Sequence, residues 1–153
     1  MTEQTLVLIK PDGVQRLLVG RLLARYEDRG LKLVGLKLVR IGREQAEAHY
    51  AVHRDKPFFP GLVDFIVSGP LVAAVFEGPD AIAVVRAING ATRPAEAAPG
   101  SIRGDLALET GHNLVHASDA SETASAEIAL WFRPSELLDY RRDIDLWVAG
   151  EEG

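Results

Sequence analysis

The sequence contains no cysteine among its 153 residues. Disulfide bonds and thiolate metal sites are therefore excluded, and this composition is compatible with a reducing cytoplasm. Long apolar runs are also missing, because the longest, Leu71 to Phe76, falls far short of the roughly 20 residues needed to span a bilayer. The acidic start, Met1 to Gln4, is unlike a secretory signal peptide, which begins with positive charge. We therefore expect a cytoplasmic protein without membrane segments.

Positive charge is scarce as well. The 17 lysines and arginines are outnumbered by 22 acidic residues, which gives a net charge of −5. A phosphate polymer is held by replacing its counterions with Lys and Arg, so nucleic-acid binding is disfavoured as the main function. A local cationic pocket for a small anion stays possible, because the local field decides such binding.

Several common signatures are missing too. The sequence has no G-x-x-x-x-G-K-[ST] phosphate loop and no G-x-G-x-x-G dinucleotide motif. It also lacks H-E-x-x-H and paired histidines at helical spacing, so no protein-held zinc or other metal site is expected.

The composition and length of the sequence are typical of a single globular domain. The apolar fraction of 47% and the charged fraction of 25% are typical, and no internal repeat or linker divides residues 1–153. The apolar patterns predict strands over 5–9, 31–41, 71–76 and 114–117, and helices over 14–29, 43–51, 62–66, 81–88 and 121–131. This order favours a ferredoxin-like βαββαβ sandwich, an α+β fold in which helices pack on one face of a four-stranded antiparallel sheet.

Three local features add detail to this outline. Gly35 is expected to be a bend or bulge that reverses which face the apolar side chains take. Residues 91–112 show no periodicity and are expected to form a long loop before the last strand. Asp119 and Glu122 have the spacing of a capping box for the last long helix.

The end of the predicted strand 114–117 carries the side chain best suited to chemistry, His116. Histidine is a competent phosphate nucleophile near neutral pH when one ring nitrogen is free and the other is held by an acceptor. Glu127, on the following helix, is a reasonable acceptor. By spacing alone, the favoured explanation of His116 is a strand-end histidine bonded to a backbone carbonyl.

Other residues could bind an anion or a base, although each has an ordinary structural explanation. Thr92, Arg93 and Arg103 lie in the glycine-containing loop, which suits phosphate but also suits a solvated surface. Lys10 follows a strand, and Arg86 borders a buried helical face. The aromatic rings of Tyr50 and Phe58 could pack in the core or stack on a nucleotide base.

Taken together, these residues resemble the nucleoside diphosphate kinase family over nearly the whole chain. The resemblance rests on six blocks in the same order, with Glu127, Trp131 and Phe132 completing it: Thr5 to Val14, Lys56 to Phe59, Ser68 to Pro70, Gly90 to Thr92, Pro99 to Asp105, and Asn113-x-x-His116-x-Ser118-Asp119.

The resemblance implies a phosphotransferase that works by a ping-pong cycle. His116 would take the γ-phosphate from a nucleoside triphosphate and pass it to a diphosphate, with Glu127 and Ser118 fixing its ring. Lys10 would act in catalysis and binding. Arg86, Thr92, Arg103 and Asn113 would contact phosphates and sugar, Phe58 would stack on the base, and Tyr50 would support the pocket. Mg²⁺ would be held mainly by the nucleotide phosphates and water. Members of the family assemble as tetramers or hexamers, so a homo-oligomer is expected.

Some positions depart from the family pattern. Ala117 stands where glycine is common, His112 where arginine is frequent, and Ser101 where threonine is usual. None of these changes removes a group with a chemical role. A ferredoxin-like nucleotide sensor or scaffold is the alternative function, but a sensor needs no nucleophile. Phosphate transfer to a protein acceptor is a further possibility, because the same phosphohistidine would serve it.

Overall fold

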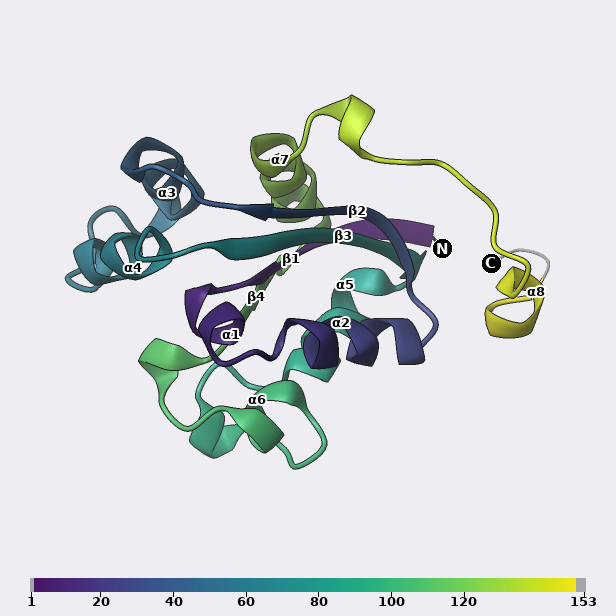
Figure 1. Cartoon of the computed structure of the whole chain (residues 1–153), viewed down its shortest axis with the longest axis horizontal. Helices are drawn as coiled ribbons and strands as arrows, with labels where there is room; N and C mark the ends of the chain where they lie inside the picture. Colours follow the sequence, from purple (N-terminus) through teal and green to yellow (C-terminus); the bar gives the residue numbers. More distant parts are fainter. Residues whose placement is uncertain (1, 151–153) are drawn as a thin grey trace.

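The computed structural model describes residues 2–150, and a single antiparallel sheet organises them (Figure 1). Its strands are β1 (Thr2–Ile9), β2 (Lys32–Val39), β3 (Leu71–Pro79) and β4 (Val115–Ala117). Their order in the sheet is β2-β3-β1-β4, and every neighbouring pair is antiparallel. This is the ferredoxin-like arrangement, so the predicted fold class is confirmed.

Helices cover both faces of the sheet, whereas the sequence pattern predicted one (Figure 1). One face carries α1 (Pro11–Gln15), α2 (Val19–Asp28), α5 (Ala81–Asn89) and α6 (Ile102–Leu106). The other face carries α3 (Arg43–His49), α4 (Phe59–Ile66) and α7 (Ser121–Trp131). Along β1, Val7 and Ile9 enter the first core while Leu6 and Leu8 enter the second. Two buried layers therefore fix the two central strands from both sides.

The helix predicted over 14–29 is interrupted. It divides into α1 and α2 at Leu17, which has a positive φ of 61° and is almost fully exposed. The predicted apolar stripe survives the break, because Leu18, Leu22 and Tyr26 are buried. Gly30, with φ of 100°, follows the end of α2 as expected for a glycine that terminates a helix.

β2 is bulged and lies at the edge of the sheet. Its pairing with β3 shifts between Leu33 and Gly35, which confirms the predicted bulge. After the shift, the side chains of Leu36 and Leu38 face outward, 49% and 66% exposed. The apolar positions beyond the bulge therefore point away from the core.

The segment predicted as a structureless loop, 91–112, contains regular structure. It holds two 3-10 turns, η2 (Pro94–Glu96) and η3 (Thr110–His112), with α6 between them. The hydroxyl of Ser101 caps α6 by accepting a bond from the Gly104 amide at 3.0 Å. Elements this short carry too few residues for an apolar period to be visible.

The predicted capping box at Asp119 and Glu122 is wrong. α7 starts at Ser121 as expected, but its N-cap is Ala120 and no side chain caps it. Asp119 therefore lies one position too early to serve as the cap.

Residues 137–150 form a strap that passes β2. After η4 (Pro134–Glu136), the amide of Leu138 donates to the Val34 carbonyl at 2.9 Å, and the strap ends in α8 (Asp145–Val148). A further 3-10 turn, η1 (Ala51–His53), follows α3.

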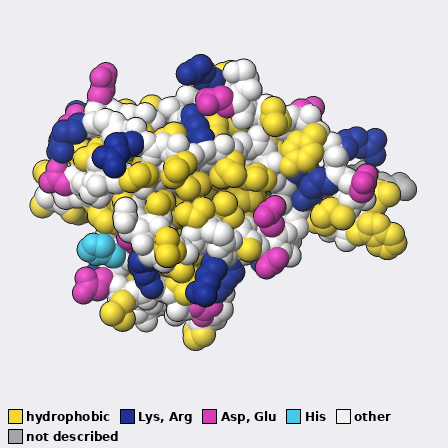
Figure 2. All heavy atoms as spheres, viewed as in Figure 1, with side chains coloured by type: hydrophobic (Ala, Val, Ile, Leu, Met, Phe, Trp, Pro, Cys, Tyr) yellow, Lys and Arg dark blue, Asp and Glu magenta, His cyan; other side chains and the backbone are white. Residues whose placement is uncertain are grey.

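Figure 2 shows apolar side chains across the middle of one face and around α8 at its right end. Among residues 2–150, no helix is long and apolar enough to cross a membrane; the cytoplasmic location stays a prediction.

Candidate active site

A pocket of about 1170 Å³ lies between β4, α3, α4, α5, α6 and α7, and Lys10, just after β1, forms part of its wall. It gathers nine of the ten predicted site residues in its lining: Lys10, Tyr50, Phe58, Arg86, Thr92, Arg103, Asn113, His116 and Glu127. The tenth, Ser118, is fully buried and contacts Glu127 from outside the lining. Residues separated by more than a hundred positions in the chain therefore meet in one cavity.

His116 sits in β4, opposite Leu8 of β1, so the sheet fixes its backbone. Its Nε2 lies 2.8 Å from Oε2 of Glu127, and its side chain is 27% exposed. An ionised carboxylate can only accept, so Nε2 carries the hydrogen of this bond. In the neutral ring, Nδ1 is then left with its lone pair, which is the state a nucleophile requires.

Glu127 is held through both oxygens. While Oε2 accepts from His116, Oε1 accepts from the Ser118 hydroxyl at 2.6 Å. Burial alone would raise the pKa of Glu127, but the hydrogen bonds from His116 and Ser118 outweigh it and the pKa is lowered. The carboxylate is therefore charged and fixed in orientation at neutral pH.

The backbone just before His116 is strained. Leu114 has a φ of 74° although it is a fully buried leucine, and the Val115 amide donates to the Asn113 carbonyl at 2.9 Å across it. Asp12 Oδ2 accepts from the Leu114 amide at 3.1 Å, and the Leu114 carbonyl accepts from the Lys10 amide at 2.8 Å. Such a conformation costs about 1–3 kcal/mol and persists only when its surroundings fix it. This turn sets the direction in which β4 presents His116.

Lys10 is a buried cation in the pocket wall. Its Nζ donates to Oδ1 of Asn113, and the Asn113 side-chain amide donates to the Thr92 carbonyl at 3.0 Å. Burial lowers the pKa of Lys10 to about 8, against the opposing charge of Asp12. Lys10 is therefore still protonated at neutral pH, and an incoming anion would stabilise that charge.

Arg103 also has a structural role, which was not predicted from the sequence. Its three nitrogens donate to the backbone carbonyls of Asn113, Gly90 and Val115 at 3.1, 2.9 and 2.6 Å. Burial lowers its pKa from the usual value, but a guanidinium stays charged. Since it has five N–H groups, Arg103 can clamp the loop to β4 and still offer hydrogens to an anion.

The pocket mouth is aromatic. Phe58 is 52% exposed, and its ring centroid lies 5.4 Å from that of His53. Tyr50 is buried, and this burial raises its pKa to about 12, so its hydroxyl stays protonated. An exposed ring in the pocket lining offers a surface on which a base can stack.

His49 is a pocket residue that the sequence analysis missed. It is buried beside His116 and bonds to Trp131, and nothing in its local sequence distinguishes it from an ordinary helix-end histidine. Ligand atoms of His49, His116 and Glu127 lie within 4.8 Å of one another and could together hold a metal ion. Two imidazoles suit zinc or copper, whereas Mg²⁺ prefers oxygen ligands.

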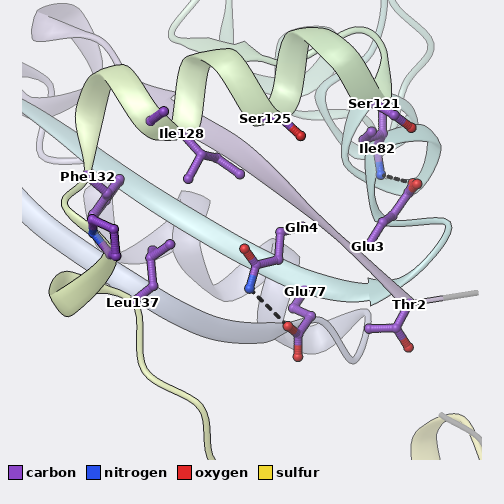
Figure 3. Close-up of a pocket in the computed structure, with 12 residues that line it drawn as sticks. Thr2, Glu3, Gln4, Glu77, Ile82, Ser121, Ser125, Ile128, Phe132 and Leu137 are labelled. Atoms are coloured by element: carbon purple, nitrogen blue, oxygen red, sulfur yellow. Dashed lines mark hydrogen bonds between the residues drawn. The ribbon is translucent and has the colours of Figure 1, made fainter.

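A second groove, of about 560 Å³, lies between α7 and the outer ends of β1 and β3 (Figure 3). Three of its polar side chains are engaged in internal hydrogen bonds. Gln4 donates to Glu77 at 3.0 Å, and Glu3 accepts from the Ile82 amide at 3.0 Å. Both titratable side chains in this groove, Glu3 and Glu77, therefore make hydrogen bonds within the protein. The larger pocket is the better candidate for the active site.

Comparisons with known proteins agree with this geometry. A family model described as nucleoside diphosphate kinase matches residues 3–137. The nucleoside diphosphate kinase of Thermomicrobium roseum is 57% identical over 148 residues, covering 97% of this chain and 99% of that one. That of Carboxydothermus hydrogenoformans is 53% identical over 146 residues, covering 95% and 98%.

Solved structures are similar over the same length. The halophilic nucleoside diphosphate kinase of Halobacterium salinarum, solved in complex with CDP, has a TM-score of 0.94 at 53% identity and covers 97% of this chain and 99% of that one. A Babesia bovis protein of the same family has a TM-score of 0.93 at 44% identity, covering 95% and 99%. The chain therefore belongs to the nucleoside diphosphate kinase family, and the predicted family and enzyme class are confirmed.

Proposed function

We propose that this enzyme moves the terminal phosphate between nucleotides through a phosphohistidine at Nδ1 of His116. The observation that carries the proposal is the 2.8 Å pair between His116 Nε2 and Glu127 within a cavity that also contains Lys10 and Arg103. This arrangement leaves one ring nitrogen free to attack and aims cations into the same space.

Two half-reactions would complete the cycle. The Nδ1 lone pair forms a bond to the γ-phosphorus of a triphosphate, and the bond from that phosphorus to its bridging oxygen breaks, releasing the diphosphate. A terminal oxygen of a second diphosphate then attacks the phosphorus, and the P–N bond breaks. The proton on Nε2 stays beside Glu127 throughout, so the carboxylate stabilises the positive charge on the ring.

The cationic side chains in the pocket lining would bind the phosphates. Lys10, Arg86 and Arg103 line the pocket, and Thr92 and Asn113 add a hydroxyl and an amide within reach of the sugar and phosphates. Phosphoryl transfer is mainly positioning plus charge stabilisation, so these groups supply what the reaction needs. Phe58 would stack on the base, and Tyr50 would support the pocket. Stacking depends little on which base is bound, so different nucleotides can be accepted.

Transfer of this kind needs a divalent cation, for which we propose Mg²⁺. The cluster of His49, His116 and Glu127 has two nitrogen ligands and does not suit this ion. The rest of the lining contains three cations, Lys10, Arg86 and Arg103, and two carboxylates, Asp64 and Asp119, that do not belong to this cluster. Mg²⁺ would therefore be held by phosphate oxygens and water, where it neutralises the charge of the phosphates.

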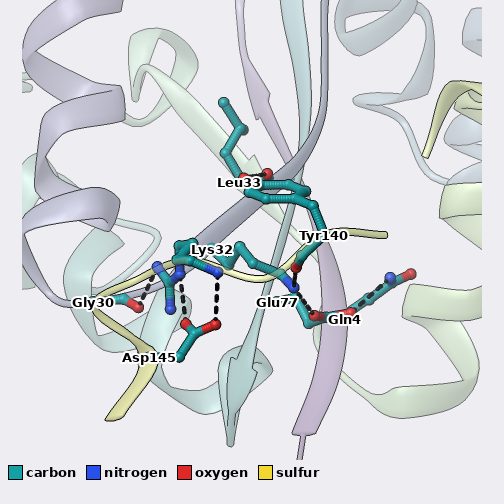
Figure 4. A network of polar contacts seen from close by, with 8 residues as sticks. Gln4, Gly30, Lys32, Leu33, Glu77, Tyr140 and Asp145 are labelled. Carbon is teal, nitrogen blue, oxygen red and sulfur yellow. Dashed lines mark hydrogen bonds and ion pairs between the residues drawn. The ribbon is translucent and has the colours of Figure 1, made fainter. Parts of the chain in front are cut away.

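We also propose that the enzyme is a homo-oligomer, a tetramer or hexamer. Within residues 2–150, no strand pairs with the outer edge of β2, which exposes Leu36 and Leu38. The C-terminal strap contacts the beginning of β2 through a polar network that includes Lys32, Glu77 and Tyr140 (Figure 4). An exposed apolar edge strand is a template for pairing with another chain, and a second copy satisfies it.

Nucleotide exchange tests the proposed function. The purified protein is mixed with ATP, Mg²⁺ and GDP, CDP or UDP, and formation of each triphosphate is followed. We expect exchange with all three, and its loss in His116→Ala with nucleotide binding retained. Binding without exchange in the wild type would point to a sensor, and exchange unchanged in His116→Ala would refute the assignment of the nucleophile.

A further inference from the structure

His49 is a buried histidine pressed against the nucleophile. Its side chain has no exposed surface, and its ring centroid lies 4.6 Å from that of His116, with the two planes at 80°. The indole of Trp131 closes its other side at 5.5 Å. Burial, helped by the nearby His116, lowers the pKa of His49 to about 3, so the ring is neutral at working pH.

The contact with Trp131 fixes which nitrogen of His49 carries the hydrogen. Nε1 of Trp131 donates to Nδ1 of His49 at 3.1 Å. An indole nitrogen can only donate, so Nδ1 is unprotonated and the hydrogen of the neutral ring is on Nε2. Within the described part of the chain, Nε2 has no hydrogen-bond partner although it is buried. The hydrogen bond from Trp131 therefore determines the tautomer of His49, because no bond at Nε2 does so.

The fixed nitrogen lies close to the carboxylate that His116 uses. Nδ1 of His49 is 3.8 Å from Oε2 of Glu127, the same oxygen that accepts from His116 at 2.8 Å. With a hydrogen on Nδ1, His49 would become a second donor to this oxygen after a shift of about an ångström, since such bonds span roughly 2.7–3.2 Å. The charge of Glu127 would then be divided between two rings.

We propose that Trp131 and His49 form a tautomer lock that reserves Glu127 for the nucleophile. The inference rests on the proposed phosphotransfer at His116. Trp131 keeps hydrogen off the Nδ1 of His49, so His116 receives the undivided carboxylate and its ring keeps the orientation that leaves its own Nδ1 free. His49 and Trp131 are positioning residues, because they act on the substrate through Glu127 and His116.

The test compares single and double substitutions in the full-length protein. Trp131→Phe keeps an aromatic ring but removes the N–H, so His49 can carry its hydrogen on Nδ1 and donate to Glu127. His49→Phe removes the competing donor. The measured quantity is the single-turnover rate of His116 phosphorylation by γ-labelled ATP, with nucleotide affinity and thermal midpoint measured in parallel. Tyr140→Phe, which removes a hydroxyl bonded to the Leu33 carbonyl in the strap, is the matched control.

The lock predicts an unusual pattern. Trp131→Phe should slow phosphorylation about tenfold, the loss expected when a charged hydrogen bond is weakened, while nucleotide affinity changes little. Adding His49→Phe should recover most of this rate, because replacing both partners by apolar rings removes the competitor. The ¹⁵N shifts of His49 should show its hydrogen moving from Nε2 to Nδ1 in Trp131→Phe.

Two results would overturn the lock: an unchanged rate and tautomer in Trp131→Phe, or a double variant slower than the single one. The second result would mean that the residues act through packing alone. If Trp131→Phe does not fold, replacing Trp131 with its benzothiophene analogue removes the N–H at constant shape and gives the same comparison. Absence of label on wild type would instead refute the proposed function, so the two failures can be told apart.

Discussion

At the scale of single residues, the proposed phosphorylation of His116 depends on the charge of Glu127. We expect Glu127→Gln to fold, because the amide can still bond to His116 and Ser118 in place of the carboxylate. Its phosphorylation rate should fall about tenfold or more, since a bond to a charged acceptor is roughly twice as strong as a neutral one. Single-turnover labelling measures the rate, and wild-type speed would show that the charge has no role.

The lowered pKa of Lys10 predicts a pH dependence of binding. The group is charged below about pH 8 and loses its charge as pH rises through that value. Nucleotide affinity should therefore weaken up to about tenfold for each pH unit above this point, because bound phosphate favours the charged form. Calorimetric titrations across this range check it. Lys10→Gln should bind weakly with no such slope, and an equally steep slope in that variant would assign the dependence to another group.

At the scale of elements, short α6 depends on its cap. Ser101 accepts from the Gly104 amide at 3.0 Å and donates to the Ala98 carbonyl at 2.6 Å. Ser101→Ala removes both bonds and should lower the free energy of unfolding by about 1 kcal/mol, as for other lost N-caps. Ser101→Thr keeps the hydroxyl and is the control. Equal stability of the alanine and wild-type proteins in denaturant titrations would contradict the cap.

Elements with many apolar residues could be predicted from the sequence, and those held by distant contacts could not. The run from Leu71 to Phe76 indicates a buried central strand, and α7 begins and ends where its pattern predicts. The break at Leu17 was missed because the apolar stripe continues across it. α6 was missed because Arg103 and Ser101 hold it through tertiary and capping bonds, which leave no periodic signal.

The site shows the same division. His116, Glu127 and the cationic residues are recognisable because their motifs resemble a known family, and the structure brings them together. The positive φ of Leu114 and the contact of His49 with Trp131 are not recognisable, because each depends on residues distant in sequence. Chemical groups can therefore be read from the chain, whereas the geometry that orients them arises from packing.

At the scale of the whole molecule, the β2 edge predicts self-association. Leu38→Lys places a charge at the exposed edge and should lower the mass in sedimentation experiments, because burying an unpaired charge between copies is costly. Leu17→Lys is the matched control, since Leu17 is also an exposed leucine, 88% accessible, but lies in the break between α1 and α2 and not on the β2 edge. A mass unchanged by Leu38→Lys would place the contact between copies elsewhere.

Trapping the phosphoenzyme tests whether His116 carries the phosphate between nucleotides. The protein is incubated with γ-labelled ATP and Mg²⁺, freed of nucleotide, and chased with unlabelled GDP. We expect an acid-labile, base-stable label on the wild type, no label on His116→Ala, and complete transfer of the label to GTP in the chase. A folded, nucleotide-binding wild type that takes up no label, or a label that persists in His116→Ala, would contradict it.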